Sequence, residues 1–381
     1  MLRVLQVYKD YYPPVKGGIE GHINLLACGL RERCIDVEVL VSNTRPSLER
    51  GLVEGIRVTK VPELGRLASA PINVTFPYWL KKLGRDADVL HFHFPNPTAE
   101  LSYLISRLNG KVVVTYHSDI IRQARLRLLY TPFLTKFLES TQTIVATSPN
   151  YVRSSPVLTR FRKKCRIVPL GIDLSKFTIW PEDAPMVASI RRAYGSRIVL
   201  FIGRFRYYKG IHVLVEAMNW VKGKLLLIGA GPLETELRAQ ASASKAGQKI
   251  VFLGEVSDTE KVAYLRTCDL LVLPSILRSE AFGIVLLEAM ACAKPVISTE
   301  LGTGTSFVNQ HLKTGIVVPP GDVQAMAHAI NHLLAKPELR EKYGTAGRER
   351  VEQCFAKDKM LDSIIKIYQE EEKEDTRNKP K

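Results

Sequence analysis

The sequence predicts an α/β protein built from two doubly wound parallel-sheet domains in tandem. Three observations favour this fold class. The chain has 381 residues, more than the about 250–300 residues at which a single hydrophobic core stops growing. Short runs rich in Val, Ile and Leu alternate with helical patterns from end to end, as in parallel sheets covered by helices on both faces. The alternation pauses once, over residues 170–185, and then restarts.

The elements follow in order along the chain. In the first half we expect strands at residues 2–8, 37–42, 57–62, 88–93, 111–117, 143–148 and 165–171, and a helix from Glu20 to about Arg33. The strands of the second half are expected at 197–204, 224–231, 250–256, 268–275, 295–300 and 314–322. The helical patterns there cover residues 210–221, 233–244, 258–266, 283–293, 322–335, 338–354 and 358–371.

The pause over residues 170–185 holds two prolines and few apolar positions in register, which indicates a linker. We therefore expect an N-terminal domain over residues 1–175 and a C-terminal domain over 176–357. A final segment, 358–381, carries the last helix and ends in a tail that is too charged to fold alone.

Composition describes an ordinary globular protein, with 46% hydrophobic and 24% charged residues. The six cysteines are scattered without a CxxC pair, so neither a zinc site nor a disulfide framework is indicated. No apolar run approaches the roughly 18 residues of a membrane span, and the first residues lack a signal-peptide pattern. We expect a cytoplasmic protein.

The formal net charge is +16 and is unevenly distributed. Up to residue 175 there are 25 basic and 14 acidic side chains, against 29 and 24 in the rest. The densest basic segments, 120–140 and 153–166, mix cations with Leu, Phe or Ile. Such a mixture favours an anionic membrane surface over nucleic acid, because single-strand binders need stacking aromatics. An ordinary basic surface stays open as the alternative.

Ligands of open parallel sheets bind beyond the carboxyl ends of strands, and several motifs lie there. After the first strand come Gly17 and Gly18, whose lack of side chains allows a phosphate to approach a helix N-terminus. A plain tight turn explains this pair equally well. His93 and His117 end two other strands of the first half, and His117 can donate a hydrogen bond to a substrate oxygen there.

Two cations follow the first strand of the second domain. Arg204 and Lys209 lie five residues apart in a loop that ends at Gly210, and together they can clamp a diphosphate and stabilise the charge that grows as it leaves. For Arg206 a solvated surface role is at least as plausible.

The most informative segment is Glu280-Ala-Phe-Gly-Ile-Val-Leu-Leu-Glu288. It places one carboxylate in a loop and a second in the following helix, close to a positive helix terminus. Such a corner suits a polyhydroxylated, phosphorylated ligand.

Two further patterns argue against other chemistry. Residues 229–232 read Gly-Ala-Gly-Pro and lack the GxGxxG and the following acidic residue of a nicotinamide site. Asp86 and Asp88 form a DxD pattern, but they precede a strand, at the wrong end of the sheet for a ligand-binding metal. We expect a structural capping role for them and no metal.

At this point the sequence resembles the retaining glycosyltransferases of family 4, which have the GT-B fold of two Rossmann-like domains around a cleft. The matching motifs occur in the same order over nearly the whole chain. They are the Gly17-Gly18 loop, TYHSD with His117, GRFRYYKG with Gly203, GAGP with Gly231, and SEAFGIVLLEAMACAKPVI followed by TGIVVPPGD. The Glu-x7-Glu of the last cluster is the most specific of them.

The resemblance implies a role for each matching residue. Arg204 and Lys209 would bind the donor diphosphate, Glu288 the ribose hydroxyls and Glu280 the transferred sugar. His117 would face the donor sugar from the N-terminal, acceptor-binding domain. The last helix would cross back to that domain. Further donor contacts are implied for Gly17, Gly18, Gly203, Gly231, Glu255, Val256, Phe282, Gly283 and Ile284.

The expected activity is therefore transfer of a hexose from a nucleotide-diphosphate sugar, slightly preferring GDP-mannose over a UDP-hexose, with no cofactor. A glycan or a polyprenyl-diphosphate-linked sugar would be the acceptor, at the inner face of the cell membrane. A sugar phosphorylase or a sugar-nucleotide epimerase of the same fold is one alternative. A non-catalytic nucleotide-binding, membrane-docking protein is the other.

Overall fold

A computed structural model describes residues 1–15, 17–67, 70–106, 108–120, 124–177 and 184–370. Its contacts divide the chain into two compact units. The N-terminal unit comprises residues 1–146, 157–168 and those from 358 onward, and the C-terminal unit comprises 147–156 and 169–357. The expected domains differ at two places: a short segment after residue 146 belongs to the C-terminal unit, and the change between units falls at 168 instead of 175. The last helix belongs to the N-terminal unit.

The N-terminal unit contains an eight-stranded sheet in the order β10-β9-β8-β7-β1-β2-β4-β3. All neighbours are parallel except the edge pair β3–β4. Its strands are β1 (Arg3–Val7), β2 (Asp36–Ser42), β3 (Glu49–Val53), β4 (Ile56–Val61), β7 (Val89–Phe94), β8 (Lys111–Tyr116), β9 (Thr143–Ala146) and β10 (Cys165–Ile167). A separate hairpin joins β5 (Arg66–Leu67) and β6 (Ala70–Pro71).

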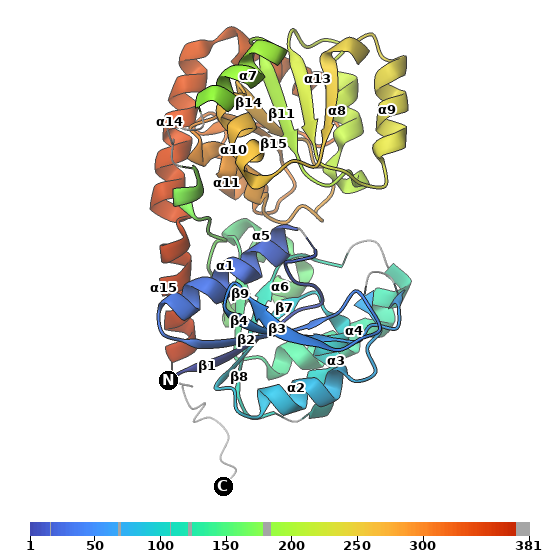
Figure 1. The fold of residues 1–381 in the computed structure, drawn as a ribbon, viewed down its shortest axis with the longest axis vertical. Helices are drawn as coiled ribbons and strands as arrows, with labels where there is room; N and C mark the ends of the chain where they lie inside the picture. The colour runs from blue at the N-terminus through green and yellow to red at the C-terminus, as the bar shows by residue number, and fades with distance from the viewer. Residues whose placement is uncertain (16, 68–69, 107, 121–123, 178–183, 371–381) are drawn as a thin grey trace. The chain divides into compact units, whose positions relative to one another are not determined.

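Helices cover both faces of this sheet (Figure 1). On one face, α1 (Gly18–Glu32) and α15 (Lys357–Gln369) pack on Val and Ile side chains in a shared core. The two helices approach so closely that a Cβ on Gly29 would lie 2.4 Å from Leu361 Cδ1. The other helices of this part of the chain are α2 (Phe76–Gly84), α3 (Pro97–Ser106), α4 (Ala124–Ser140) and α6 (Pro156–Arg160).

The C-terminal unit contains a six-stranded parallel sheet in the order β13-β12-β11-β14-β15-β16. Its strands are β11 (Ile198–Ile202), β12 (Lys224–Ile228), β13 (Ile250–Gly254), β14 (Leu270–Leu273), β15 (Val296–Thr299) and β16 (Gly315–Val318). Its helices are α5 (Pro149–Ser154), α7 (Ala184–Tyr194), α8 (Ile211–Ala217), α9 (Glu234–Ala243), α10 (Asp258–Thr267), α11 (Ile284–Ala291), α12 (Thr305–Val308), α13 (Val323–Ala335) and α14 (Pro337–Cys354).

Two hydrophobic cores lie on opposite faces of this second sheet. One is formed with α8, α9 and α13, and the other with α10, α11 and α14. Alternate residues of each strand enter opposite cores, as Val199 and Leu200 of β11 do, because successive side chains of a strand point to opposite faces. The continuous apolar strands of the sequence are therefore explained by burial on both sides, and the predicted doubly wound fold is confirmed for both units.

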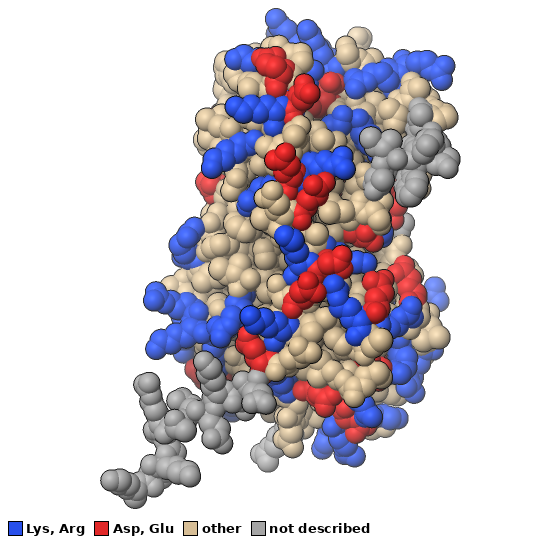
Figure 2. Space-filling model, turned by 90° about the vertical axis from the view of Figure 1, so that its left-hand side faces the viewer, with Lys and Arg blue, Asp and Glu red and all other residues tan. Residues whose placement is uncertain are grey.

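Surface charge is mixed. On the face drawn in Figure 2, acidic side chains lie among the basic ones over much of the surface, so the positive charge is dispersed there. Among the residues that the structure describes, no helix combines the length and apolar character that a membrane crossing requires.

Candidate active site

The strand order of the C-terminal unit reverses between β11 and β14, where chain connections leave in opposite directions. Ligands of open α/β sheets bind at such a switch point, beyond the carboxyl ends of the strands. The loop after β11 carries Arg204 and Lys209, and the loop after β14 carries Glu280. The topology therefore brings together the segments that the sequence singled out.

Glycine backbone geometry fixes the loop after β11. Gly210 adopts φ +65°, and a Cβ there would lie 2.1 Å from the backbone oxygen of Pro274, just after β14. Only glycine tolerates both the left-handed conformation and this contact. Gly203 starts the loop at φ +155° and lies against the Lys209 side chain. The β11 loop is thus held directly against the end of β14.

Lys209 and Glu280 form an ion pair, with Nζ 2.5 Å from Oε2. Both are nearly sealed from solvent, with side chains 13% and 9% exposed. Burial by itself lowers the pKa of Lys209, but the adjacent Glu280 carboxylate outweighs it, so the pKa is raised. The Ser275 hydroxyl donates a further hydrogen bond of 3.2 Å to the same carboxylate oxygen. A fixed ammonium charge and an oriented carboxylate therefore lie side by side.

Arg204 is arranged differently. Its side chain is exposed and forms no hydrogen bond or ion pair with any residue that the structure describes. Arg206 is also exposed. Two different cations therefore follow β11. Lys209 is held by the Glu280 carboxylate, whereas the N–H donors of Arg204 remain available to a ligand.

Helix α11 begins at a glycine that cannot be replaced without strain. Gly283 has φ +82°, and a Cβ there would lie 2.8 Å from Leu273 of β14. The first N–H groups of the helix, from Ile284 on, have no intrahelical acceptors, as at every helix start. The Phe282 side chain is buried against Phe355, so only its backbone can serve a ligand.

Glu288 lies one turn into α11 and pairs with Lys261 of α10, with Oε1 2.9 Å from Nζ. Burial lowers the pKa of Lys261, but Glu288 and Asp258 outweigh it, and the pKa is raised. A capping box between Ser257 and Glu260 fixes the start of α10. The carboxylate is therefore held in place from a neighbouring helix.

The remaining predicted donor residues of the C-terminal unit lie in loops at the same edge of its sheet. Gly231 follows β12 and packs on the backbone of Phe205, leaving no room for a Cβ. Glu255 and Val256 follow β13, and Glu255 is exposed. No hydrogen bond or ion pair joins these two described residues to the Lys209–Glu280 pair.

Sequence reasoning missed three residues that support the site. Lys261 holds Glu288, Ser275 binds the Glu280 carboxylate, and the Thr303 hydroxyl donates to the Glu280 backbone oxygen at 2.8 Å. Ser275 and Thr303 both follow the carboxyl ends of strands, a position that could have indicated them. Lys261 gives no such signal, because its role depends on the packing of α10 on α11.

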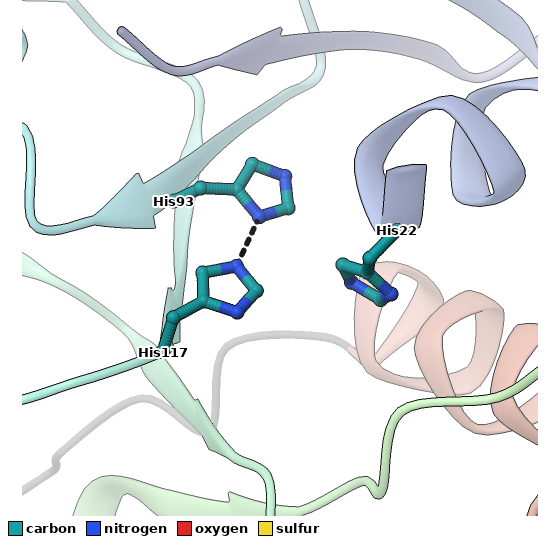
Figure 3. Close-up of side chains that lie close together, drawn as sticks. All are labelled: His22, His93 and His117. Carbon is teal, nitrogen blue, oxygen red and sulfur yellow. Dashed lines mark hydrogen bonds between the residues drawn. The ribbon is translucent and has the colours of Figure 1, made fainter. Parts of the chain in front are cut away.

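In the N-terminal unit, the face of the sheet beneath α1 and α15 turns polar toward the strands' carboxyl ends. His91 and His93 of β7 share that face, because they are two residues apart. His117 follows β8, and His93 Nδ1 lies 3.0 Å from His117 Nε2 (Figure 3). His22 of α1 lies edge-on to both of those rings. His93 and His117 were predicted as site residues from the sequence, but the cluster was not.

All four histidines are buried, and burial lowers their pKa values. The pKa falls to about 4 for His22 and about 3 for His91, and well below the usual range for His93 and His117. The rings are therefore neutral at pH 7, and each has one N–H and one bare nitrogen.

His22, His93 and His117 could in principle hold a metal ion, since their donor atoms lie within 4.8 Å of one another and His22 Nδ1 has no partner. Nitrogens around a tetrahedral zinc ion with bonds of 2.0–2.1 Å lie about 3.3 Å apart. The His93–His117 separation fits that spacing, but both nitrogens already satisfy each other. Hydrogen bonding explains the His93–His117 pair, while His22 Nδ1 is buried without a hydrogen-bond partner.

The glycine pair and the DxD pattern also have defined surroundings. Gly17 caps α1, and the Glu20 carboxylate occupies the space where a Gly17 Cβ would lie, 2.1 Å away. The Asp88 carboxylate accepts a hydrogen bond of 2.7 Å from the Arg3 backbone N–H. This bond joins the starts of β1 and β7, so Asp88 has a structural role where these strands begin.

Comparison with known proteins gives consistent matches. The family described as Glycosyl transferases group 1 matches residues 186–350, and Glycosyltransferase Family 4 matches residues 16–176. The O-antigen chain mannosyltransferase C of Escherichia coli is 40% identical over 369 residues, which are 96% of this chain and 98% of that protein. The D-rhamnosyltransferase WbpZ of Pseudomonas aeruginosa is 40% identical over 355 residues, 93% of this chain and 92% of the relative.

Among solved structures, sucrose-phosphate synthase from Thermosynechococcus elongatus superimposes with a TM-score of 0.79 at 23% identity. The similarity covers 97% of this chain and 98% of that one, so the two share a fold. The chain therefore belongs to glycosyltransferase family 4, and it is a sugar-transferring enzyme with the GT-B fold that its sequence motifs predicted.

Proposed function

We propose that this enzyme is a retaining, metal-independent hexosyltransferase whose donor is GDP-mannose or, as the second choice, a UDP-hexose. The observation that carries the proposal is the grouping of Arg204, Lys209, Glu280 and Glu288 at the switch point of one sheet. This edge offers cations for a diphosphate and carboxylates for hydroxyl groups, as a nucleotide sugar requires.

In the proposed reaction, an acceptor hydroxyl attacks the anomeric carbon on the face from which the diphosphate departs. The bond from carbon to phosphate oxygen breaks, and the departing phosphate takes the acceptor proton. Arg204 and Lys209 stabilise the charge that develops on that phosphate. Glu280 is unsuited to be a nucleophile, because Lys209 and Ser275 already bind its Oε2.

Double displacement by two protein carboxylates is disfavoured for a further reason. A retaining glycosidase places its two carboxyl groups about 5–5.5 Å apart on either side of the sugar. Glu280 and Glu288 instead belong to one loop–helix corner, and each has its own lysine partner. We assign Glu280 to the transferred sugar and Glu288 to the ribose.

The preference for mannose draws support from the mannosyltransferase relative, and the rhamnosyltransferase relative keeps a deoxyhexose open as the transferred group. A thermal-shift panel of GDP, UDP, ADP and their hexose conjugates tests the donor. A ligand at 100 times its Kd stabilises the protein by about 2.7 kcal/mol, so we expect the largest shift with GDP-mannose. A larger shift with UDP and its conjugates would replace mannose by a UDP-hexose.

The stereochemistry is tested on the product. Transfer from GDP-α-mannose should give an α-mannoside, identified by the anomeric proton signal. A β-linked product would contradict front-face displacement. Full activity after dialysis against a chelator is expected, and loss of activity restored by Mg²⁺ or Mn²⁺ would contradict metal independence.

For the acceptor we propose a glycan carried on a polyprenyl diphosphate at an anionic membrane surface. An apolar groove of about 330 Å³ in the N-terminal unit supports this, lined by residues that include Leu67, Ile72, Leu101 and Ile105. Three of these four are exposed by 46–71%, and they line one groove together, as exposed apolar residues at interaction sites do.

Two lysines of α2 follow a residue that lines the groove. Lys81 and Lys82 follow Pro77, a lining residue, by about one turn of α2, and both are exposed. Of the predicted membrane segments, Leu129 and Phe133 in 120–140 are 72% and 51% exposed, while residues 121–123 lie outside the described part. In 153–166, Lys164 donates hydrogen bonds to three backbone carbonyls near the end of α4 and is occupied structurally.

Vesicle sedimentation tests the surface. Binding to vesicles with anionic lipids should weaken as salt rises, because exposed charges are screened within about a Debye length. We expect the K81E/K82E double variant to bind more weakly, with donor affinity unchanged. Absence of binding to anionic vesicles, or binding that salt does not weaken, would refute the membrane proposal and leave the donor proposal intact.

A further inference from the structure

A continuous chain of buried hydrogen bonds runs through the polar face of the N-terminal sheet. At one end, His91 Nε2 lies 2.7 Å from Thr115 Oγ1, and His91 Nδ1 lies 2.6 Å from the Tyr368 hydroxyl. The Gln6 amide donates to the same hydroxyl at 3.2 Å. Tyr368 belongs to α15, so the last helix of the chain takes part in this network.

The other end of this chain of hydrogen bonds is His117. Gln6 Oε1 lies 2.6 Å from His93 Nε2, and His93 Nδ1 lies 3.0 Å from His117 Nε2. The remaining nitrogen, His117 Nδ1, forms no hydrogen bond with a described residue and lies on the side of the ring away from His93 (Figure 3).

Because both rings are neutral, the orientation of the Gln6 amide fixes the protons of His93 and His117. An amide oxygen accepts only, so Gln6 Oε1 requires a proton on His93 Nε2. His93 Nδ1 is then bare and must accept from a proton on His117 Nε2. Turning the Gln6 amide over would reverse the direction of these hydrogen bonds, but it would place two nitrogen atoms 2.6 Å apart. That distance is short even for an N–H···O bond, and two nitrogen atoms tolerate it less well than a nitrogen and an oxygen.

We propose that this chain of hydrogen bonds is a positioning relay that holds His117 as the Nε2–H tautomer, so that Nδ1 accepts a hydrogen bond from a hydroxyl of a bound sugar. The inference rests on the proposed function and on the sugar-facing role that the resemblance implies for His117. It reverses the expected direction of the bond, since the sequence-based expectation was that His117 donates it. Gln6 and Tyr368 are positioning residues in this scheme.

The direction matters for the reaction. The transition state of glycosyl transfer resembles an oxocarbenium ion, and hydrogen bonds to sugar hydroxyls strengthen in it. A hydroxyl that donates to His117 Nδ1 gains electron density and stabilises the positive ring. A hydroxyl that accepts from an N–H loses density, which has the opposite effect.

The test is nitrogen-15 spectroscopy of histidine-labelled protein together with kinetics of the Q6M variant. In the native protein we expect His117 to be protonated on Nε2. In Q6M, His93 loses the acceptor for its Nε2–H, so its proton moves to Nδ1 and the proton of His117 moves to Nδ1 in turn. The kcat with GDP-mannose should fall about tenfold, the equivalent of one hydrogen bond, while the donor KM changes less than threefold.

Two further variants separate the relay from general packing. Y368F removes the hydroxyl that anchors the Gln6 amide, so a smaller loss of kcat in the same direction is expected. T141V removes a buried hydroxyl that donates to Phe137 at 2.9 Å, away from the relay. It should lower the melting temperature but leave the His117 tautomer and kcat as in the native protein.

A His117 that carries its proton on Nδ1 in the native protein would overturn the inference, as would a Q6M enzyme with native kcat. The spectroscopic measurement needs no substrate. If none of the nucleotides in the thermal-shift panel binds, the proposed function fails, while the tautomer of His117 still decides the relay.

Discussion

Two buried polar clusters, one in each unit of this enzyme, are stabilised in opposite ways. In the N-terminal unit, four buried histidines are neutral because burial lowers their pKa values, and their hydrogen bonds join neutral groups. In the C-terminal unit, Lys209 and Lys261 stay charged because a carboxylate lies against each ammonium group.

The difference teaches how each polar group can act. A series of hydrogen-bonded neutral side chains can fix the direction of a hydrogen bond to a ligand, but it cannot balance a full charge. An ion pair supplies charge. Removing one of its partners leaves an uncompensated buried charge, which strongly destabilises the folded protein. Charge stabilisation is therefore expected in the C-terminal unit, and hydroxyl orientation in the N-terminal one.

The largest expected effect is loss of a clamp cation. R204A or K209A should lower kcat at least 10²–10³-fold, as removal of one preorganised donor does at other anionic sites. Steady-state transfer from GDP-mannose measures it. R206A is the matched control, since it removes an exposed cation two residues from Arg204 and should cost less than threefold. Near-native turnover in either clamp variant would remove the basis for assigning charge stabilisation to this unit.

The next effect concerns the ribose. E288Q should raise the donor KM roughly ten- to hundredfold, the range for losing one hydrogen bond to a charged group. Native enzyme should bind GDP more tightly than 2′,3′-dideoxy-GDP, and the variant should bind both equally, as measured by calorimetry. Undiminished discrimination in E288Q would show that Glu288 serves only Lys261.

The pH dependence of stability should distinguish the units. A histidine whose folded pKa is lowered contributes stability above its unfolded pKa of about 6.5, and this stability is lost as pH falls toward about 4. The raised pKa values of Lys209 and Lys261 act oppositely, so their contribution is present below about pH 10.5 and lost above it.

We therefore expect the N-terminal unit to lose on the order of 10 °C in melting temperature between pH 7 and 4. Peptide-resolved hydrogen exchange should locate the weakening at β7 and β8. Equal weakening of β11 and β14 over this range would mean that the histidines do not set the difference.

The smallest expected effect comes from Glu100 in the N-terminal unit. Burial raises the pKa of Glu100 to about 8, despite a hydrogen bond from the Asn96 backbone N–H. Its raised folded pKa gives stability that is present below about pH 4.5 and lost as pH rises through 8. The E100Q variant cannot ionise, so at pH 9 it should melt on the order of 5 °C higher than the native protein. Parallel melting curves from pH 6 to 9 would contradict this.

Much of the fold followed from pattern alone. The predicted helix at 258–266 is α10, Asp258–Thr267, and the predicted strand at 224–231 is β12, Lys224–Ile228. The capping box of Ser257 and Glu260 marks the start of α10, and a continuous apolar run marks β12. The antiparallel strand β3 was missed because its residues are mostly exposed and carry no apolar pattern. The helix α7 was missed because it begins inside the stretch interpreted as a linker.

By itself, the sequence determined the tandem α/β architecture, the loops at strand ends and the motif of Glu280 and Glu288, because these depend on neighbours within about ten residues. Only the tertiary structure decided that Lys209 pairs with Glu280, that Lys261 holds Glu288, and that Tyr368 reaches His91 across 277 positions of sequence. The physical reason is that burial and the distance between charges set pairing and protonation, and both arise only when topology brings distant segments together.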